Sequence, residues 1–201
     1  CFILKPSEQT PLSTFKIAEY LKEAGLPDGV FNIINGARET VESICDHPDI
    51  KAVAFVGSSH VAKIVYSRSA LNGKRALCLG GAKNHMIVVP DADQDSTAKG
   101  LLASSMGSAG QRCMAASVAV GVADVDPIID QLVEEAKNYK LGVDMGTIVS
   151  KAALDRITNY IDEAEKMGAK VLIDGRNSTP PEGYENGYWL GATILDGVDP
   201  D

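Results

Sequence analysis

The sequence predicts an α/β protein built on a parallel sheet with helical crossovers. Short apolar runs rich in β-branched residues alternate with segments of helical periodicity through the first half of the chain. The chain has 201 residues, of which 45% are hydrophobic, enough for one large domain or two small ones. It contains no run of 18 apolar residues, so we expect no membrane span.

In the first half, residues 11–24 place apolar side chains on one helical stripe, and Gly25 stops the helix. Ser58 and Ser59 are suited to cap the helix that follows the AFVG run. The expected strands are 2–4, 30–34, 51–57 and 75–79, and the expected helices are 11–24, 38–45 and 59–71. The stripe of the first helix consists of Leu12, Phe15, Ile17, Tyr20 and Leu21.

Gly80 and Gly81 interrupt the alternation and mark the expected domain junction. We therefore predict two domains, residues 1–80 and 81–201. In the second, the expected strands are 86–90 and 171–174, with a further apolar run at 116–122, and the expected helices are 95–105, 127–138 and 151–167. The periodicity of the helix at 127–138 places five residues inward, Ile128, Ile129, Leu132, Val133 and Ala136. A loop rich in Gly, Pro, Asn and Ser covers 175–188 and precedes the run YWLGATIL.

Charge and ligand-forming residues exclude several kinds of function. The formal net charge is −8, and Lys and Arg form no cluster, so we expect no nucleic-acid partner. The four cysteines and three histidines show no metal-ligand spacing, so we expect no metal site. Cysteines without a CxxC pair indicate reduced thiols in a reducing compartment. The relevant positions are Cys1, Cys45, Cys78, Cys113, His47, His60 and His85.

The stretch GSAGQRCMA, residues 107–115, places Arg112 directly before Cys113 among small side chains. A thiol in such surroundings is open to close approach, and a neighbouring positive charge or a helix N-terminus favours its nucleophilic thiolate form. A buried structural cysteine is the alternative. The Arg112 guanidinium requires a partner, which is either a carboxylate of the protein or one on the substrate.

Three turns after expected strands are candidate ligand sites. The AFVGSS turn, with Gly57 and Ser58, leads from a strand into a helix and presents backbone N–H groups suited to a phosphate. The NGARET turn, with Gly36, is of the same type. Lys5 and Glu8 of KPSE are placed to hold sugar hydroxyls. Taken alone, each pattern is better explained by an ordinary capped turn or a solvated charged turn, and no GxGxxG motif is present.

Taken together, these stretches resemble the aldehyde dehydrogenase superfamily in order and spacing. The matching segments are KPSE, GLPDGVFNIING, AFVGSS, LGGAKNH with VPDAD, and GQRCMA. CDHPDIKA, KNH and QRCMA narrow the resemblance to the branch that acylates coenzyme A and acts on methylmalonate or malonate semialdehyde. The resemblance implies a Rossmann-like coenzyme domain (partial) joined to an α/β catalytic domain (partial), with NAD as cofactor and coenzyme A as co-substrate.

The resemblance also implies roles for single residues. Cys113 would be the nucleophile and its backbone N–H half of the oxyanion hole, and Arg112 would bind the substrate's own carboxylate. Lys5 and Glu8 would hold the adenine ribose. Gly57 and Ser58 would lie under the pyrophosphate, with Gly36 in the neighbouring turn.

Hydrolytic members carry a Glu where this chain has Leu79 or Cys78, depending on the alignment. Neither residue can act as a carboxylate base, so the sequence favours transfer to coenzyme A over hydrolysis. A hydrolytic enzyme with a displaced base and a non-catalytic fragment are the alternatives. We expect a central piece of a longer chain, inactive alone and part of a homodimer or homotetramer, in the cytoplasm of a bacterium or the mitochondrial matrix of a eukaryote.

Overall fold

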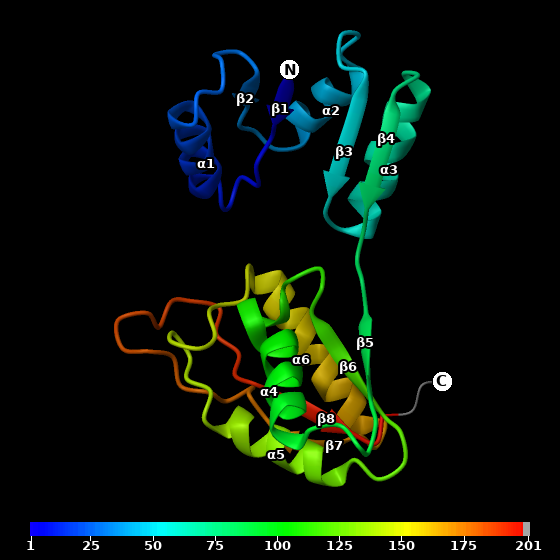
Figure 1. Cartoon of the computed structure of the whole chain (residues 1–201), viewed down its shortest axis with the longest axis vertical. Coiled ribbons are helices and arrows are strands. Elements are labelled where there is room, and N and C mark those ends of the chain that lie inside the picture. Colours follow the sequence, from blue (N-terminus) through cyan, green and yellow to red (C-terminus); the bar gives the residue numbers. More distant parts are fainter. Residues whose placement is uncertain (199–201) are drawn as a thin grey trace. The chain divides into compact units, whose positions relative to one another are not determined.

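The computed structural model describes residues 1–198 and divides into two compact units, Cys1–Gly81 and the part from Ala82 onward (Figure 1). Each unit contains helices and strands in alternation, and the strands pair mainly in parallel. The α/β class predicted from the sequence is therefore confirmed. Within residues 1–198, every helix is too short or too polar to cross a bilayer.

The first unit contains two parallel strand pairs, β1 with β2 and β3 with β4. A parallel pair requires a crossover, and a helix supplies it in each case. The strands are β1 (Phe2–Leu4), β2 (Phe31–Ile33), β3 (Ala52–Val56) and β4 (Arg75–Leu79), and the helices are α1 (Leu12–Glu23), α2 (Arg38–Asp46) and α3 (Ser59–Leu71).

The second unit packs α4 and α5 side by side next to the parallel pair β5–β6 (Figure 1). The pair β7–β8 is antiparallel, which the sequence reasoning did not anticipate. The strands are β5 (Asn84–Val88), β6 (Ala116–Gly121), β7 (Lys170–Ile173) and β8 (Ile194–Asp196). The helices are α4 (Gln94–Met106), the short turn η1 (Gly107–Gly110), α5 (Asp126–Lys137) and α6 (Lys151–Lys166).

The second unit has an apolar core between α4, α5 and the adjoining strands. Its members share near-complete burial and are Val88, Ala98, Leu101, Leu102, Val125, Ile128, Leu132, Ala136 and Ala192. Ile128, Leu132 and Ala136 recur at the spacing of one helical face, as the sequence periodicity predicted. This core fixes the C-terminal end of α4, from which the chain continues to Cys113.

The structure adds to one expectation from the sequence and corrects another. The apolar stripe expected on α1 is not buried in the described residues, and Leu12 and Tyr20 are 78% and 57% exposed. Periodicity identifies residues that share a helix face but does not identify what covers that face. The strand expected at 86–90 instead spans Asn84–Val88, because the pairing with β6 begins at Asn84 and Pro90 has no N–H to donate.

Charged side chains join α2 to α3. The Arg68 guanidinium donates to both Asp46 carboxylate oxygens, at 2.8 and 2.6 Å, and lies 3.2 Å from Glu42. Arg38 also donates to Glu42, at 2.7 Å. The hydrogen bond from Arg68 is the main cause that lowers the pKa of Asp46, and the hydrogen bond from Arg38, with help from Arg68, lowers the pKa of Glu42.

These lowered pKa values predict a pH-dependent contribution of Arg68 to stability. Because both carboxyls have lower pKa values when folded, the contribution is fully present above their ordinary values of 3.8 and 4.5 and is lost as the pH falls through the lowered values. Arg68→Met should therefore decrease the free energy of unfolding at pH 7, and this decrease should shrink steadily below pH 4.5.

Urea denaturation at several pH values measures this effect. Lys63→Met removes a positive charge from the exposed side of the same helix and should show no such pH dependence. A loss that is equal at pH 7 and pH 3 would show that Arg68 acts through its packing alone.

Candidate active site

Cys113 lies on an exposed loop between η1 and β6. The Asn84 side chain, at the start of β5, donates to the backbone carbonyl of Cys113 at 2.8 Å and to that of Ala115 at 3.1 Å. The thiol is therefore accessible while its backbone is held from the neighbouring strand. Cys113 does not stand at the N-terminus of a helix, so the helix dipole considered in the sequence analysis does not act on it there.

The chain reaches Cys113 through a tight reversal after α4. Ser108, Ala109 and Gly110 have φ angles of 55°, 52° and 71°, in the left-handed region that L-residues avoid. Each non-glycine residue in this conformation costs about 1–2 kcal/mol. Such a turn persists only where surrounding contacts hold it.

The Gln111 side chain supplies three of those contacts. Its amide nitrogen donates to the carbonyls of Ser108 and Thr147, each at 3.1 Å, and its amide oxygen accepts from the Val149 N–H at 2.8 Å. Gln111 therefore ties the reversal to the segment before α6. The sequence reasoning did not single out Gln111, although one long amide among small side chains was the available signal.

The Arg112 side chain turns back towards α4. Its guanidinium donates to the backbone carbonyl of Ala103, in the last turn of α4, and lies against Gly107. A positive charge at this end of a helix complements the helix dipole. Among residues 1–198, no carboxylate oxygen lies within 4.0 Å of the Arg112 guanidinium, so Arg112 forms no ion pair there.

In the first unit, three predicted residues meet. The Lys5 ammonium donates to the carbonyls of Gly36 and Pro6, at 2.7 and 2.6 Å, and lies 3.4 Å from the Glu8 carboxylate. The backbone N–H of Glu8, followed by Lys5, lowers the pKa of the Glu8 carboxyl. The Glu8 side chain is 61% exposed and that of Lys5 is 15% exposed, so an ammonium fixed in a turn stands beside an accessible carboxylate.

The turn between β3 and α3 has the geometry of a capped helix start. The Ser58 hydroxyl accepts from the Val61 N–H at 3.4 Å. The N–H groups of Ser59 and His60 lie in the first turn of α3, where no carbonyl of the helix precedes them to accept a hydrogen bond. The end of β4 approaches closely, and Gly81 donates to the Ser59 hydroxyl at 3.0 Å. This helix start suits an anion.

All five predicted coenzyme-binding residues follow the carboxyl ends of parallel strands. Lys5 and Glu8 come after β1, Gly36 after β2, and Gly57 and Ser58 after β3. In open α/β sheets, ligands bind outside these ends of the strands.

The two positions expected for a carboxylate base, Cys78 and Leu79, are on β4. Cys78 is half-buried. Burial raises the pKa of its thiol, and Cys45 adds to this effect.

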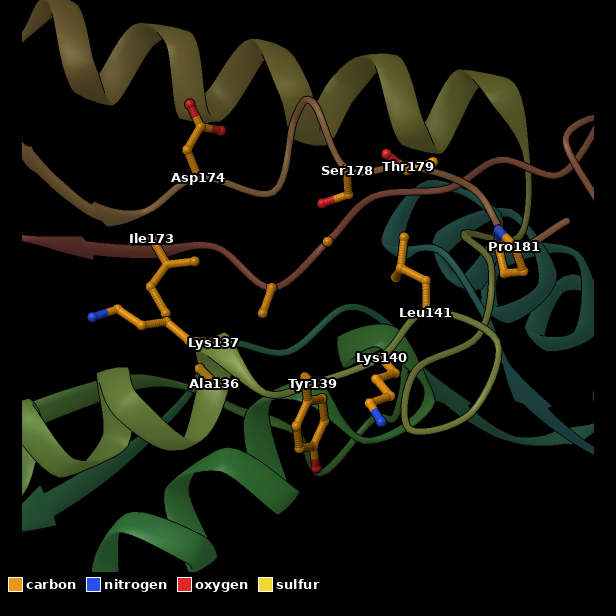
Figure 2. A pocket seen from close by; sticks show the side chains of 12 residues that line it. Ala136, Lys137, Tyr139, Lys140, Leu141, Ile173, Asp174, Ser178, Thr179 and Pro181 are labelled. Carbon is orange, nitrogen blue, oxygen red and sulfur yellow. The ribbon is translucent and has the colours of Figure 1, made fainter.

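Two of the hollows in the described residues have a volume of about 400 Å³ each. One is lined by the end of α5, by the end of β7 and by the loop after it, and Figure 2 shows Tyr139, Lys140, Asp174, Ser178 and Thr179 around it. It contains none of the predicted site residues. The other, in the first unit, is bordered by Ser59, Lys63, Cys78, Gly80 and Gly81, beside the capped helix start.

Comparison with known proteins shows a consistent similarity. The sequence model of the aldehyde dehydrogenase family matches residues 1–201. The chain is 49% identical over 206 residues to the acylating mitochondrial methylmalonate-semialdehyde dehydrogenase of Arabidopsis thaliana, covering 100% of this chain and 34% of that protein. It is 45% identical over 208 residues to malonate-semialdehyde dehydrogenase of Pseudomonas aeruginosa, covering 100% of this chain and 42% of that protein.

A solved structure gives the same picture. A protein from Sinorhizobium meliloti, described as a putative methylmalonate-semialdehyde dehydrogenase and crystallised with NAD, superimposes with a TM-score of 0.93 at 48% identity, covering 100% of this chain and 42% of that one. The chain thus spans less than half the length of the relatives that it matches.

The geometry predicts an order of reactivity for the four thiols, none of which is paired. Iodoacetamide should modify the exposed Cys113 faster than the buried Cys45 and the half-buried Cys78, whose raised pKa reduces the thiolate fraction. Cys1, which is also exposed, is the matched control for exposure. If Arg112 activates the thiol, Cys113 should also react faster than Cys1. Peptide mass spectrometry gives each rate, and a rate for Cys113 no higher than that for Cys78 would contradict the nucleophile assignment.

Proposed function

The chain belongs to the aldehyde dehydrogenase family, and from this premise we propose that the protein oxidises methylmalonate or malonate semialdehyde with NAD and transfers the acyl group to coenzyme A. The names of its relatives support this choice of substrate. The observation that carries the proposal is the exposed thiol of Cys113 directly after Arg112, whose guanidinium is held on a helix end and, within residues 1–198, pairs with no carboxylate.

In this proposal Cys113 is the covalent catalyst. Its thiolate attacks the aldehyde carbon and forms a thiohemiacetal, and the Cys113 backbone N–H stabilises the oxyanion. Loss of hydride from that carbon leaves an acyl thioester on Cys113. Asn84 holds the carbonyl of Cys113 and thereby orients the backbone beside the thiol. The Arg112 guanidinium binds the carboxylate at the other end of the substrate, which selects a semialdehyde that carries an acid.

The first unit is proposed to hold NAD, which accepts the hydride when bound. The available donors and acceptors fit it. The Lys5 ammonium and the exposed Glu8 carboxylate suit the two ribose hydroxyls, with Gly36 holding Lys5 in place. The N-terminus of α3 at Gly57 and Ser58 suits a pyrophosphate. The domain roles follow: residues 1–80 belong to the coenzyme domain and 81–201 to the catalytic domain.

The second step is proposed to be acyl transfer to a thiol. The thiolate of coenzyme A attacks the thioester carbonyl, and the thiolate of Cys113 leaves. Neither Cys78 nor Leu79 on β4 can deprotonate water as a carboxylate base, whereas a thiolate nucleophile does not need that help. The bond from the α-carbon to the substrate carboxylate breaks with loss of carbon dioxide, and its electron pair is held as the enolate of the thioester. The α-carbon then takes up a proton, which balances the proton that the thiol of coenzyme A loses. The balance is semialdehyde, NAD⁺ and coenzyme A giving propionyl- or acetyl-coenzyme A, carbon dioxide and NADH.

The oligomeric state and the cell compartment are also part of the proposal. We propose a homodimer or homotetramer in a reducing compartment, which is the cytoplasm in a bacterium and the mitochondrial matrix in a eukaryote. The name of the Arabidopsis thaliana relative includes the mitochondrion. The unpaired thiols of all four cysteines agree with a reducing compartment.

Dependence on coenzyme A tests the second step. Without coenzyme A, the full-length protein should release NADH in a single burst of about one equivalent per active site, because the thioester on Cys113 is not hydrolysed. Added coenzyme A should give many turnovers. Sustained NADH formation without coenzyme A would instead support a hydrolytic enzyme, and the lack of both burst and turnover would support a non-catalytic protein.

Substitution of Arg112 tests substrate selection. Arg112→Leu should raise KM for the acidic semialdehyde about ten- to hundredfold, because a charged hydrogen bond contributes about 1.5–3 kcal/mol. The KM for a neutral aldehyde such as propanal should change little. Arg156→Leu, which removes an exposed arginine from α6, is the matched control. Equal effects of Arg112→Leu on both substrates would remove its proposed role.

A further inference from the structure

The Arg112 guanidinium occupies the space that a side chain at position 107 would fill. A Cβ atom added to Gly107 would stand 2.6 Å from the guanidinium carbon of Arg112 and 3.2 Å from its Nε. Separations below 3.0 Å essentially never occur for a real Cβ, so one of the two groups would have to move. The guanidinium lies at the end of the more flexible group, and it would therefore be displaced.

The backbone itself does not require glycine at this position. Gly107 has φ −57° and ψ 131°, which any residue adopts. This distinguishes it from Gly110, whose φ of 71° belongs to the left-handed reversal. The atoms that lie closest to a side chain added at residue 107, among the described residues, are thus those of the Arg112 guanidinium.

A single carbonyl joins the two residues. The Ala103 oxygen accepts from the Gly107 N–H, which closes the last turn of α4, and it also accepts from the Arg112 guanidinium. A guanidinium has five N–H groups, and this contact uses one of them. Within the part of the chain that the structure describes, Arg112 has no second hydrogen-bond acceptor, so its other N–H groups can bind a ligand, and a planar guanidinium held at one corner matches a carboxylate. Arg112 is thus oriented before any substrate arrives.

We propose that Gly107 is a specificity-determining positioning residue: by lacking a side chain, it lets the Arg112 guanidinium lie on the end of α4 in the orientation that binds the substrate carboxylate. This inference rests on the proposed role of Arg112. It assigns the discrimination between acidic and neutral aldehydes to a pair of residues, one that contacts the substrate and one that holds the first in place.

Gly107→Ala in the full-length protein tests the proposal, with Gly100→Ala as its matched control. Gly100 lies within α4, the helix whose C-terminal end Gly107 caps, and a Cβ added there would meet no atom within 4 Å. Gly107→Ala should raise KM for malonate semialdehyde at least tenfold and leave KM for propanal within twofold of the unchanged protein. Gly100→Ala should alter neither. In the Arg112→Leu background, Gly107→Ala should not change the ratio of the two KM values further.

The same variants also test the contact itself, independently of activity. If the added methyl group of Gly107→Ala lowers the melting temperature, the double variant Gly107→Ala/Arg112→Leu should melt at the temperature of Arg112→Leu alone, because the clashing group is gone. A double variant that stays destabilised would show that the methyl group clashes with something else, and the inference would be wrong.

The outcomes separate the two proposals. If Arg112→Leu discriminates between the substrates but Gly107→Ala behaves like Gly100→Ala, the inference about Gly107 fails while the role of Arg112 stands. If Arg112→Leu affects both substrates equally, the selector role fails and the specificity role of Gly107 fails with it. An equal rise in both KM values for Gly107→Ala would show a general disturbance of the loop and would also overturn the inference.

Discussion

The carbonyl oxygen of Ala103 accepts two hydrogen bonds at the end of α4, and the position of the candidate site follows from them. Helix ends leave carbonyl groups without partners inside the helix. Here the Gly107 N–H and the Arg112 guanidinium supply the partners, so the end of the helix also fixes the side chain next to the exposed thiol. The left-handed reversal through Ser108 and Ala109 makes this return possible, and Gln111 holds the reversal from its other side. The hydrogen bonds that satisfy the backbone at the end of α4 therefore also position the Arg112 side chain of the candidate site.

At the strand ends of the first unit, the polar groups that hold the turns are also the groups proposed to bind the ligand. Lys5 satisfies the carbonyls of Pro6 and Gly36 while standing beside Glu8, and Ser58 caps the helix whose next N–H groups suit an anion. Each group performs a structural task that holds its polar atoms in a defined place. Polar groups fixed in this way lose little further freedom when a ligand binds, which is the benefit of preorganisation. Because these residues follow parallel strands, the ligand would bind at the carboxyl ends of those strands.

The features predictable from the sequence were those with a short-range physical cause. The hydroxyl of Ser58 before a helical segment predicted the cap, and the apolar spacing of Ile128, Leu132 and Ala136 predicted a buried helix face. Features that depend on distant partners were not predictable. The apolar spacing on α1 predicted a stripe on one helix face, yet periodicity could not show what covers that face. The antiparallel partner of β7 and the contacts from Gln111 to Thr147 and Val149 depend on tertiary proximity. Gly107 looked like any other small residue, because its ordinary φ and ψ gave no local signal.

Under the proposed function, the positive charge of Arg112 stabilises first the Cys113 thiolate and then the substrate carboxylate. The Arg112 guanidinium neighbours the Cys113 thiolate in the chain before the reaction, and it faces the substrate carboxylate once the substrate is bound. Formation of the thioester removes the charge of the thiolate, so the carboxylate then becomes the only anion of the pair next to the guanidinium. Water would need a base to attack this thioester, and this chain has Cys78 or Leu79 at the position where hydrolytic members of the family carry a glutamate. A site that holds one anion with a fixed cation and lacks that glutamate favours an acceptor that brings its own nucleophile, and the thiolate of coenzyme A meets that requirement.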